Sequence, residues 1–247
     1  MAADENEKQS PFTRPGYIAA AVVVALIVVC AIVLIIVNLS RGDSSPAPTP
    51  STSAPSASPT ASSPAASGDE SVCGLRGVEL TGTVNTGPPA TWEFEGTMGY
   101  PTSPTYGPGK TDPAGFRYCF QHSPAGALFM AANSFAQGSA GEGNRAWAEY
   151  VFADGPYRDQ LLAQSTNTSN LAGTRTSIKG FRILNYDGKS ATIDLAVSVS
   201  TASGTTTVSG VYMLVWTGGD WKVSTQNATP LDVAPIPNVA GYTTWGE

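Results

Sequence analysis

An uncharged apolar run near the N-terminus constrains this chain more than any other feature. Residues 17–39 read YIAAAVVVALIVVCAIVLIIVNL, 23 residues without a charged side chain. As a helix the run would measure about 34 Å, enough to cross a hydrocarbon core about 30 Å thick. It is longer than the apolar core of a cleavable signal peptide, and Val29 before Cys30 does not fit a lipoprotein signal. The run therefore predicts one transmembrane helix over residues 17–39.

The charges that flank this run predict its orientation. Lys8 and Arg14 precede the run, whereas Arg41 is the one basic residue between its end and Arg76. Basic residues collect on the cytoplasmic side of membrane helices. We therefore expect a single-pass protein of the cell membrane, with a cytoplasmic tail over residues 1–16 and an extracellular main domain.

Residues 40–70 connect the apolar run to the rest of the chain, and most of them are Ser, Pro, Ala or Thr. Frequent proline disfavours regular structure, and the few apolar groups do not offset the entropy of ordering. We expect a disordered, low-complexity linker. It is either a stalk that holds a domain away from the membrane or a connection without a length requirement. The remaining residues, 71–247, are expected to form one exported domain.

The two cysteines of this domain are expected to pair, because oxidising compartments favour disulfides. A Cys73–Cys119 bridge would close a loop of 47 residues, counting both ends. Two free thiols, a metal site or a cysteine nucleophile are the alternatives. Zinc would need a fourth ligand besides these cysteines and His122. His122 precedes Ser123 and Pro124, a pattern typical of a helix start, and we interpret it as a surface residue.

Helical patterns occupy the middle of the domain. From Ser123 the apolar residues recur at helical spacing as far as Gly138, which predicts an amphipathic helix. Two shorter helical patterns follow within residues 145–164, and Gly155 and Pro156 separate them.

The region before these helices carries a short strand pattern. In TWEFEGT, Trp92 and Phe94 alternate with Glu93 and Glu95. The alternation predicts a strand whose aromatic face packs inward and whose carboxylates face solvent. The Gly- and Pro-rich stretch that follows, 99–109, is expected to be a surface loop.

The region after the helices is rich in strand patterns. From residue 174 to residue 226 alternating apolar runs are separated by Asp-Gly and Gly-Gly, which are typical of hairpin turns. The last residues, 227–247, are expected to lie over the surface. This element order predicts an α+β domain, with helices packed on a curved antiparallel sheet.

Two resemblances accompany these patterns. In element order and in the hairpin WTGGDWKV, residues 123–226 resemble the nuclear-transport-factor-two-like, or cystatin-like, fold, a curved sheet wrapped around helices. The runs CGL, TWEFEGTMGYPTSPTYGPG, RYCFQHSPAGALFMAAN and GDWKV are similar to a family of uncharacterised membrane-anchored proteins of actinobacteria. Such proteins often accompany integrative conjugative elements. Together the resemblances imply a domain similar to the wall-side domains of conjugation-channel subunits.

The composition of the domain and the lack of a reactive constellation in its sequence favour a non-enzymatic function. The carboxylates Glu149, Asp154, Asp159 and Asp194 have no spacing that brings two together, and no cofactor or metal motif is present. From residue 71 onward 10 Lys and Arg stand against 13 Asp and Glu, so direct binding of nucleic acid is not expected. We expect an envelope protein that assembles with itself or with other membrane subunits, including those of a conjugative DNA-transfer apparatus.

The alternative is an extracellular ligand- or peptide-binding module with a pocket between sheet and helices. Six aromatic residues are candidates for lining such a pocket, although packing in the core is the simpler role for each. They are Trp92, Phe129, Trp147, Tyr150, Tyr212 and Trp216.

Overall fold

A computed structural model describes residues 69–139, 145–165 and 174–247 of the protein. The predicted cytoplasmic tail, the predicted membrane helix and nearly all of the linker lie outside these residues. Among the helices of the described ranges, none is long and apolar enough to cross a membrane.

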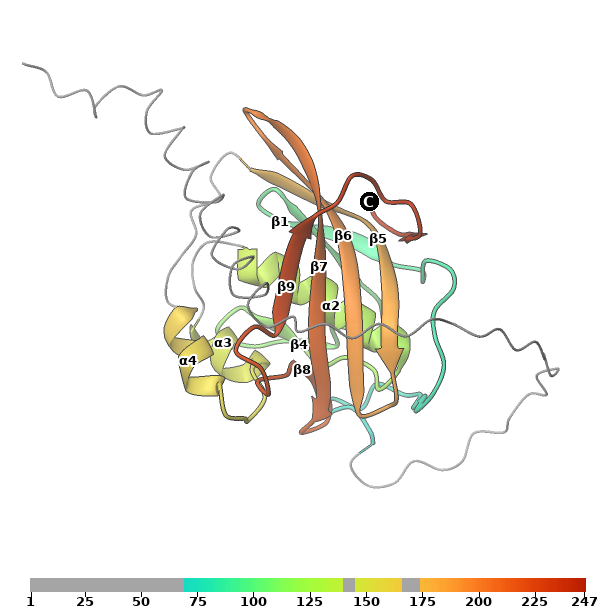
Figure 1. The fold of residues 1–247 in the computed structure, drawn as a ribbon. Coiled ribbons are helices and arrows are strands. Elements are labelled where there is room, and N and C mark those ends of the chain that lie inside the picture. The colour runs from blue at the N-terminus through green and yellow to red at the C-terminus, as the bar shows by residue number, and fades with distance from the viewer. Residues whose placement is uncertain (1–68, 140–144, 166–173) are drawn as a thin grey trace, which may run out of the picture. The chain divides into compact units, whose positions relative to one another are not determined.

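The described part is an α+β domain, in which three helices pack on a curled, mixed sheet shaped like half a barrel (Figure 1). Its elements are β1 (Thr91–Glu95), β2 (Met98–Thr102), β3 (Lys110–Thr111), β4 (Arg117–Tyr118), α2 (Pro124–Ser139), α3 (Arg145–Val151), α4 (Arg158–Gln164), β5 (Arg175–Tyr186), β6 (Ser190–Thr201), β7 (Gly204–Thr217), β8 (Asp220–Val223), β9 (Leu231–Pro235) and β10 (Thr243–Thr244).

The main sheet has the strand order β1-β2-β5-β6-β7-β8, with β10 added to β5 and β9 added to β7. Long antiparallel pairings join β5, β6 and β7, as the alternating sequence predicts. The expectation of a wholly antiparallel sheet is wrong at one junction, because β2 runs parallel to β5 where Met98 meets Thr176. Parallel strands need a long crossover connection, and the segment that contains α2, α3 and α4 provides it between β2 and β5.

The turns of the predicted hairpins form for local reasons. Between β5 and β6, the Asp187 carboxylate accepts hydrogen bonds from the backbone N–H groups of Lys189 and Ser190, at 2.9 and 2.6 Å. Gly188 follows with φ at +77°, a conformation that suits glycine. These local hydrogen bonds explain why the Asp-Gly signal predicts the turn correctly.

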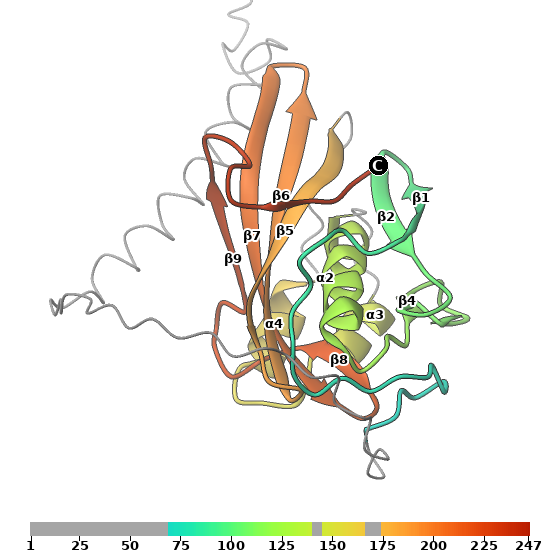
Figure 2. The same ribbon diagram turned by 90° about the vertical axis from the view of Figure 1, so that its right-hand side faces the viewer.

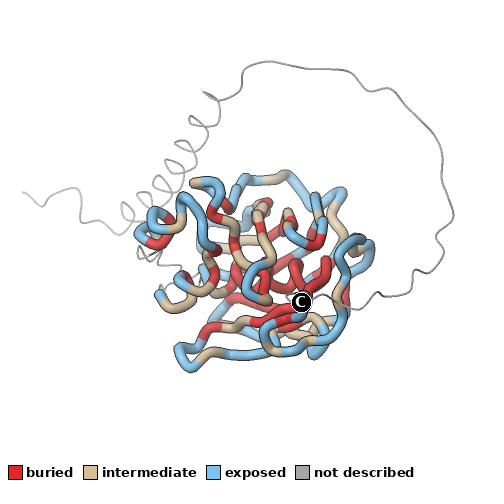
Figure 3. The backbone as a smooth tube through the Cα atoms, turned by 90° about the horizontal axis from the view of Figure 1, so that it is seen from below, coloured by how far each residue is buried: buried red, intermediate tan, exposed pale blue. Residues whose placement is uncertain are grey.

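Helix α2 begins where the sequence indicates, but it is not amphipathic. The Ser123 side chain accepts a hydrogen bond from the Gly126 N–H at 3.0 Å, which caps the helix. From its first turn to Ser134 the helix is buried on every side. In Figures 1 and 2 it lies across the concave face of the sheet, with β1 and β2 on its far side. A helix that is covered all round needs apolar or small residues all round, and Figure 3 shows the buried segments gathered in the interior.

The region before α2 corrects two expectations. Residues 99–102 are not part of a surface loop but of the buried strand β2, which pairs with β1. Of the two aromatic residues expected to pack inward from β1, Trp92 is half-buried, whereas Phe94 is 55% exposed. Of these two aromatic side chains, Trp92 alone packs against the core.

The C-terminal segment is integrated more deeply than expected. After β9 the chain crosses the sheet and returns as β10 at the edge of β5 (Figure 2). Trp245 then enters the core, with its ring 5.1 Å from Trp92 and 5.2 Å from Phe129. Its indole N–H donates to the Pro88 carbonyl at 2.9 Å. The last residues therefore close the core and do not only lie over its surface.

Candidate functional site

The disulfide predicted from the sequence is present. Cys73 and Cys119 are bridged, with their Cα atoms 6.1 Å apart. The bond ties the start of the domain to the segment between β4 and α2. The Val72 N–H also donates to Gly219 in the β7–β8 turn at 2.7 Å. The chain that leaves the linker is thus fastened to the fold at two neighbouring points, as in many exported domains.

A buried carboxylate holds the second cysteine of this bridge. Asp220 is fully buried and accepts hydrogen bonds from the backbone N–H groups of Cys119 at 2.7 Å and Phe120 at 2.8 Å. The Tyr150 hydroxyl donates to the same carboxylate at 2.7 Å. Burial raises the pKa of Asp220, and these donors oppose that rise. Through these hydrogen bonds the Asp220 carboxylate connects the β7–β8 hairpin to the disulfide and to α3.

His122 corrects the sequence interpretation, because it is a core residue and not a surface residue. It is 2% exposed and its ring stacks on Trp216 with the centroids 3.9 Å apart. Its Nδ1 lies 2.8 Å from the Asp69 carbonyl oxygen and its Nε2 contacts the Gly188 carbonyl. Both ring nitrogens face backbone oxygens, so no nitrogen of His122 is left to serve a thiol or a metal.

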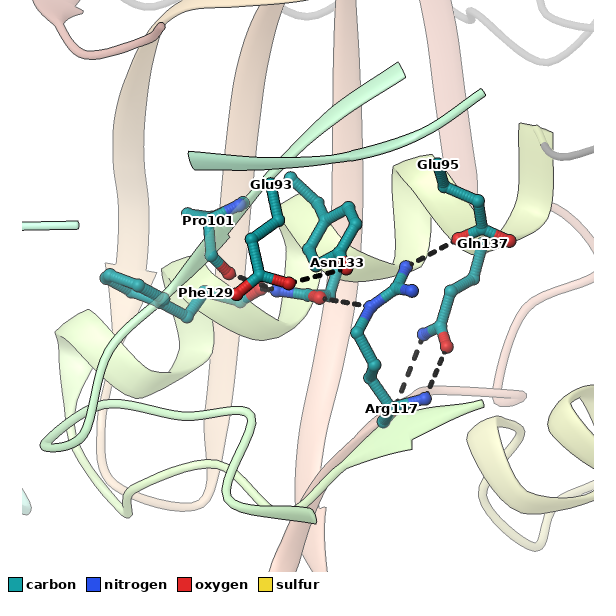
Figure 4. Close-up of polar contacts among 8 residues, drawn as sticks. Glu93, Glu95, Pro101, Arg117, Phe129, Asn133 and Gln137 are labelled. Atoms are coloured by element: carbon teal, nitrogen blue, oxygen red, sulfur yellow. Dashed lines mark hydrogen bonds and ion pairs between the residues drawn. The ribbon is translucent and has the colours of Figure 1, made fainter. Parts of the chain in front are cut away.

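The two carboxylates of β1 belong to a polar cluster between the hairpin, β4 and α2 (Figure 4). The side chain of Arg117, 11% exposed, donates to Glu95 at 2.8 Å and, from Nε, to Asn133 at 2.9 Å. Its guanidinium lies 3.7 Å from the centre of the Tyr100 ring. The Tyr100 hydroxyl donates to Glu93 at 2.9 Å.

Side-chain amides extend this cluster to the backbone. The Asn133 amide donates to the carbonyl of Pro101 at 2.9 Å, and the Gln137 oxygen accepts from the Arg117 N–H at 2.6 Å (Figure 4). Burial raises the pKa of Tyr100, and its hydrogen bond to Glu93 adds to this rise. Since the partners of Glu93 and Glu95 come from the domain itself, the cluster acts as a clamp that holds the hairpin on α2.

Five of the six aromatic candidates for a pocket, all except Tyr150, lie in the hydrophobic core or pack against it. Trp92 and Phe129 meet through Trp245, which the sequence interpretation did not select. Trp216 stacks on His122, and Tyr212 is a buried core residue of β7. The other two candidates belong to the helical side. Tyr150 packs 5.2 Å from both Phe116 and Tyr118, and the ring of Trp147 lies beside Gly138.

The four carboxylates considered for catalysis are also dispersed. Glu149 and Asp154 form exposed ion pairs with Arg145 and Arg158. Asp159 lies in the first turn of α4. The carboxylate of Asp194 is buried on β6, where it accepts hydrogen bonds from Ser209 at 2.7 Å and from Tyr242 at 2.9 Å and pairs with Arg182. This last group fastens the C-terminal segment to the sheet.

The edge of the sheet at β9 is open. β9 pairs with β7 on one side, and no described strand pairs with its other side. All five of its residues are exposed, among them Leu231 at 39% and Val233 at 49%. Open edges with apolar side chains are surfaces on which another strand can add. This strand lies in the segment that the sequence predicted only to cover the surface, and the prolines in and around it, Pro230, Pro235 and Pro237, are unfavourable in central strands.

Comparison with known proteins places the chain in a family without assigning an activity. No curated protein and no solved structure gives a significant match. Residues 49–244 match the family model described as a domain of unknown function, DUF8175. This match covers the whole described domain as far as β10 and part of the linker before it. The chain is therefore a member of the DUF8175 family.

Proposed function

We propose that this protein is a membrane-anchored, non-enzymatic envelope component whose exported domain assembles with itself or with other membrane subunits. The apolar run at residues 17–39 supplies the anchor, and the disulfide between Cys73 and Cys119 suits an exported domain. The N-terminus is cytoplasmic in this proposal, and residues 40–70 connect the membrane to the domain.

The observation that carries the proposal is the contrast between the interior and the sheet edge. The buried charged side chains Arg117, Asp194 and Asp220 all bind groups of the domain itself. The edge strand β9 instead exposes apolar side chains. Such an arrangement favours assembly over chemistry. Five of the six aromatic residues considered for a ligand pocket lie in the hydrophobic core or pack against it, which lends the binding-module alternative less support.

Membership of a conjugative DNA-transfer apparatus is the specific form of this proposal. The curled sheet around α2 is consistent with the resemblance to the nuclear-transport-factor-two-like fold, which conjugation-channel subunits use on the outer side of the membrane. The test is crosslinking of the full-length protein in intact actinobacterial cells, followed by identification of what is captured. We expect oligomers of the chain or channel subunits; recovery of monomer alone would contradict assembly.

A further inference from the structure

The backbone groups of the open edge can be assigned from the ladder between β7 and β9. The Met213 N–H donates to the Pro230 carbonyl at 3.0 Å, and the Ile236 N–H donates to Thr207 at 2.9 Å. In an antiparallel pair, hydrogen-bonded residues alternate along each strand. The even-numbered residues of β9 therefore face β7. The N–H and C=O groups of Leu231 and Val233 point away from the sheet, together with the carbonyl of Pro235.

This pattern of free groups is self-complementary. If two copies of β9 run antiparallel about a twofold axis at Val233, each Val233 exchanges two hydrogen bonds with the other Val233. Each Leu231 N–H then meets the Pro235 carbonyl of the other copy. Every outward N–H of the strand finds an acceptor, and Pro235 lies where only its carbonyl is needed.

The side chains fit the same register. Leu231 and Val233 are cross-strand neighbours of Tyr212 and Gly210, so they share one face of the sheet. Pairing about Val233 would place these exposed apolar side chains beside those of the second copy, and apolar cross-strand pairs stabilise a sheet. Asp232 would stand opposite Ala234. A register shifted to centre on Asp232 would set two carboxylates opposite each other, which is unfavourable.

The strand β1, at one end of the main sheet, is less suited to self-pairing. β1 carries Glu93, Phe94 and Glu95, with Phe94 exposed. A twofold pairing centred on Glu93 puts the two copies of that carboxylate face to face, and one centred on Phe94 puts Glu93 opposite Glu95. The placement of the carboxylates therefore favours self-pairing at β9 over self-pairing at β1.

We propose that two copies of this chain associate through β9, antiparallel about a twofold axis at Val233, so that the sheets of both copies become one. This interface rests on the proposed assembly function and names its partner as a second copy of the chain. Anchoring in a common membrane raises the effective concentration of the two domains, so a short interface suffices.

The experiment uses full-length protein in its membrane, with Cys30→Ala to remove the cysteine outside the disulfide. Val233→Cys places two thiols on Cα positions about 5.5 Å apart in the paired strands, within the range for a disulfide. We expect mild oxidation to convert this variant to a covalent dimer. Leu184→Cys, on β5 and 53% exposed, is the matched control for random collision and is expected to stay monomeric. Equal dimer yields from both variants would overturn the proposal.

A second variant tests the hydrogen bonds. Val233→Pro removes an outward N–H but no bond to β7, so the unfolding temperature should stay unchanged while dimers captured by an amine-reactive crosslinker disappear. Three other outcomes separate the proposals. Dimers that persist in Val233→Pro contradict the β9 interface and leave assembly standing. If Val233→Pro instead abolishes crosslinking to a different protein, the β9 edge binds another subunit, and pairing of two copies through β9 is contradicted. Monomer alone in the unmodified chain contradicts both proposals.

Discussion

Single buried polar residues hold this domain together where its segments meet. Asp220 lies on the last hairpin, yet its hydrogen-bond donors come from the segment before α2 and from α3. His122 joins Asp69 to Gly188 in the β5–β6 turn. Each of these side chains binds at least two backbone groups from other parts of the chain, so the cost of removing one exceeds the value of a single hydrogen bond.

The first prediction concerns Asp220. Replacing it with Asn turns one acceptor into a donor that faces other donors, and we expect a loss of about 3 kcal/mol in the free energy of unfolding. Urea denaturation of the purified protein measures the change. Asp232→Asn, on the exposed strand β9, is the control and should stay within about 0.5 kcal/mol. Equal stability of the two variants would show that Asp220 is not an anchor.

The second prediction concerns pH and Tyr212, which is 5% exposed. Burial raises its pKa above the ordinary value of 10.0. Above about pH 10 the unfolded chain releases this proton while the folded protein retains it. The unfolded state then binds fewer protons, so stability falls as pH rises, by about 1.4 kcal/mol per pH unit for this tyrosine.

Tyr212→Phe isolates this contribution. Tyr150 and Tyr186 also have raised pKa values. Because they contribute to both proteins, the free energy of unfolding of the variant is compared with that of the unmodified protein at each pH, from about pH 8 to about pH 11. We expect the stability difference to be constant below pH 10 and to shift in favour of Phe above it. A difference that does not change with pH would contradict this assignment.

At the scale of elements, the hairpin β1–β2 depends on the cluster around Arg117. The hairpin meets the rest of the main sheet at the single register pair Met98–Thr176, so its attachment relies on side chains. Arg117 contacts Glu95 of β1, Tyr100 of β2 and Asn133 of α2. One guanidinium therefore connects both strands of the hairpin to the central helix.

The third prediction follows from this arrangement. Arg117→Met leaves Glu95 without its cation and Asn133 without its donor, so we expect faster hydrogen exchange in residues 91–102 and a loss of about 2 kcal/mol. Exchange in β5–β7 should change less. Arg117→Lys keeps the positive charge but loses the planar donor set, and it should be intermediate. Uniform acceleration over the domain would mean that the cluster does not act locally.

At the scale of the whole molecule, both ends of the described chain are fastened to the fold. The disulfide holds the beginning at Cys73, and Trp245 closes the core near the end. Between them β9 is exposed along its full length.

The fourth prediction concerns the disulfide. Replacing Cys73 and Cys119 together with Ala removes a cross-link over a sequence separation of 46, which should cost about 4 kcal/mol, mainly by freeing the unfolded chain. Thermal unfolding of the double variant against the parent measures this loss. Reductant should lower the unfolding temperature of the parent and leave the variant unchanged; a parent insensitive to full reduction would contradict a stabilising role.

Features that depend on neighbouring residues could be predicted from the amino-acid sequence. The Asp187 carboxylate accepts a hydrogen bond from the Ser190 N–H across the turn at Gly188, and Ser123 caps the helix that follows it. The alternating runs of β5–β7 select strands because alternation puts one side of each run on the core. The pairing of Cys73 with Cys119 also followed from the sequence, since the domain has two cysteines and an expected oxidising location.

Features that depend on residues far apart in the chain could not be predicted from local patterns. No local pattern distinguishes the buried His122 from a surface histidine, because its partners Asp69 and Gly188 come from distant segments. The ion pair of Glu95 with Arg117 and the insertion of Trp245 arise in the same way. Alternation in sequence shows that a strand has two faces; only packing decides which face is covered and which edge stays open.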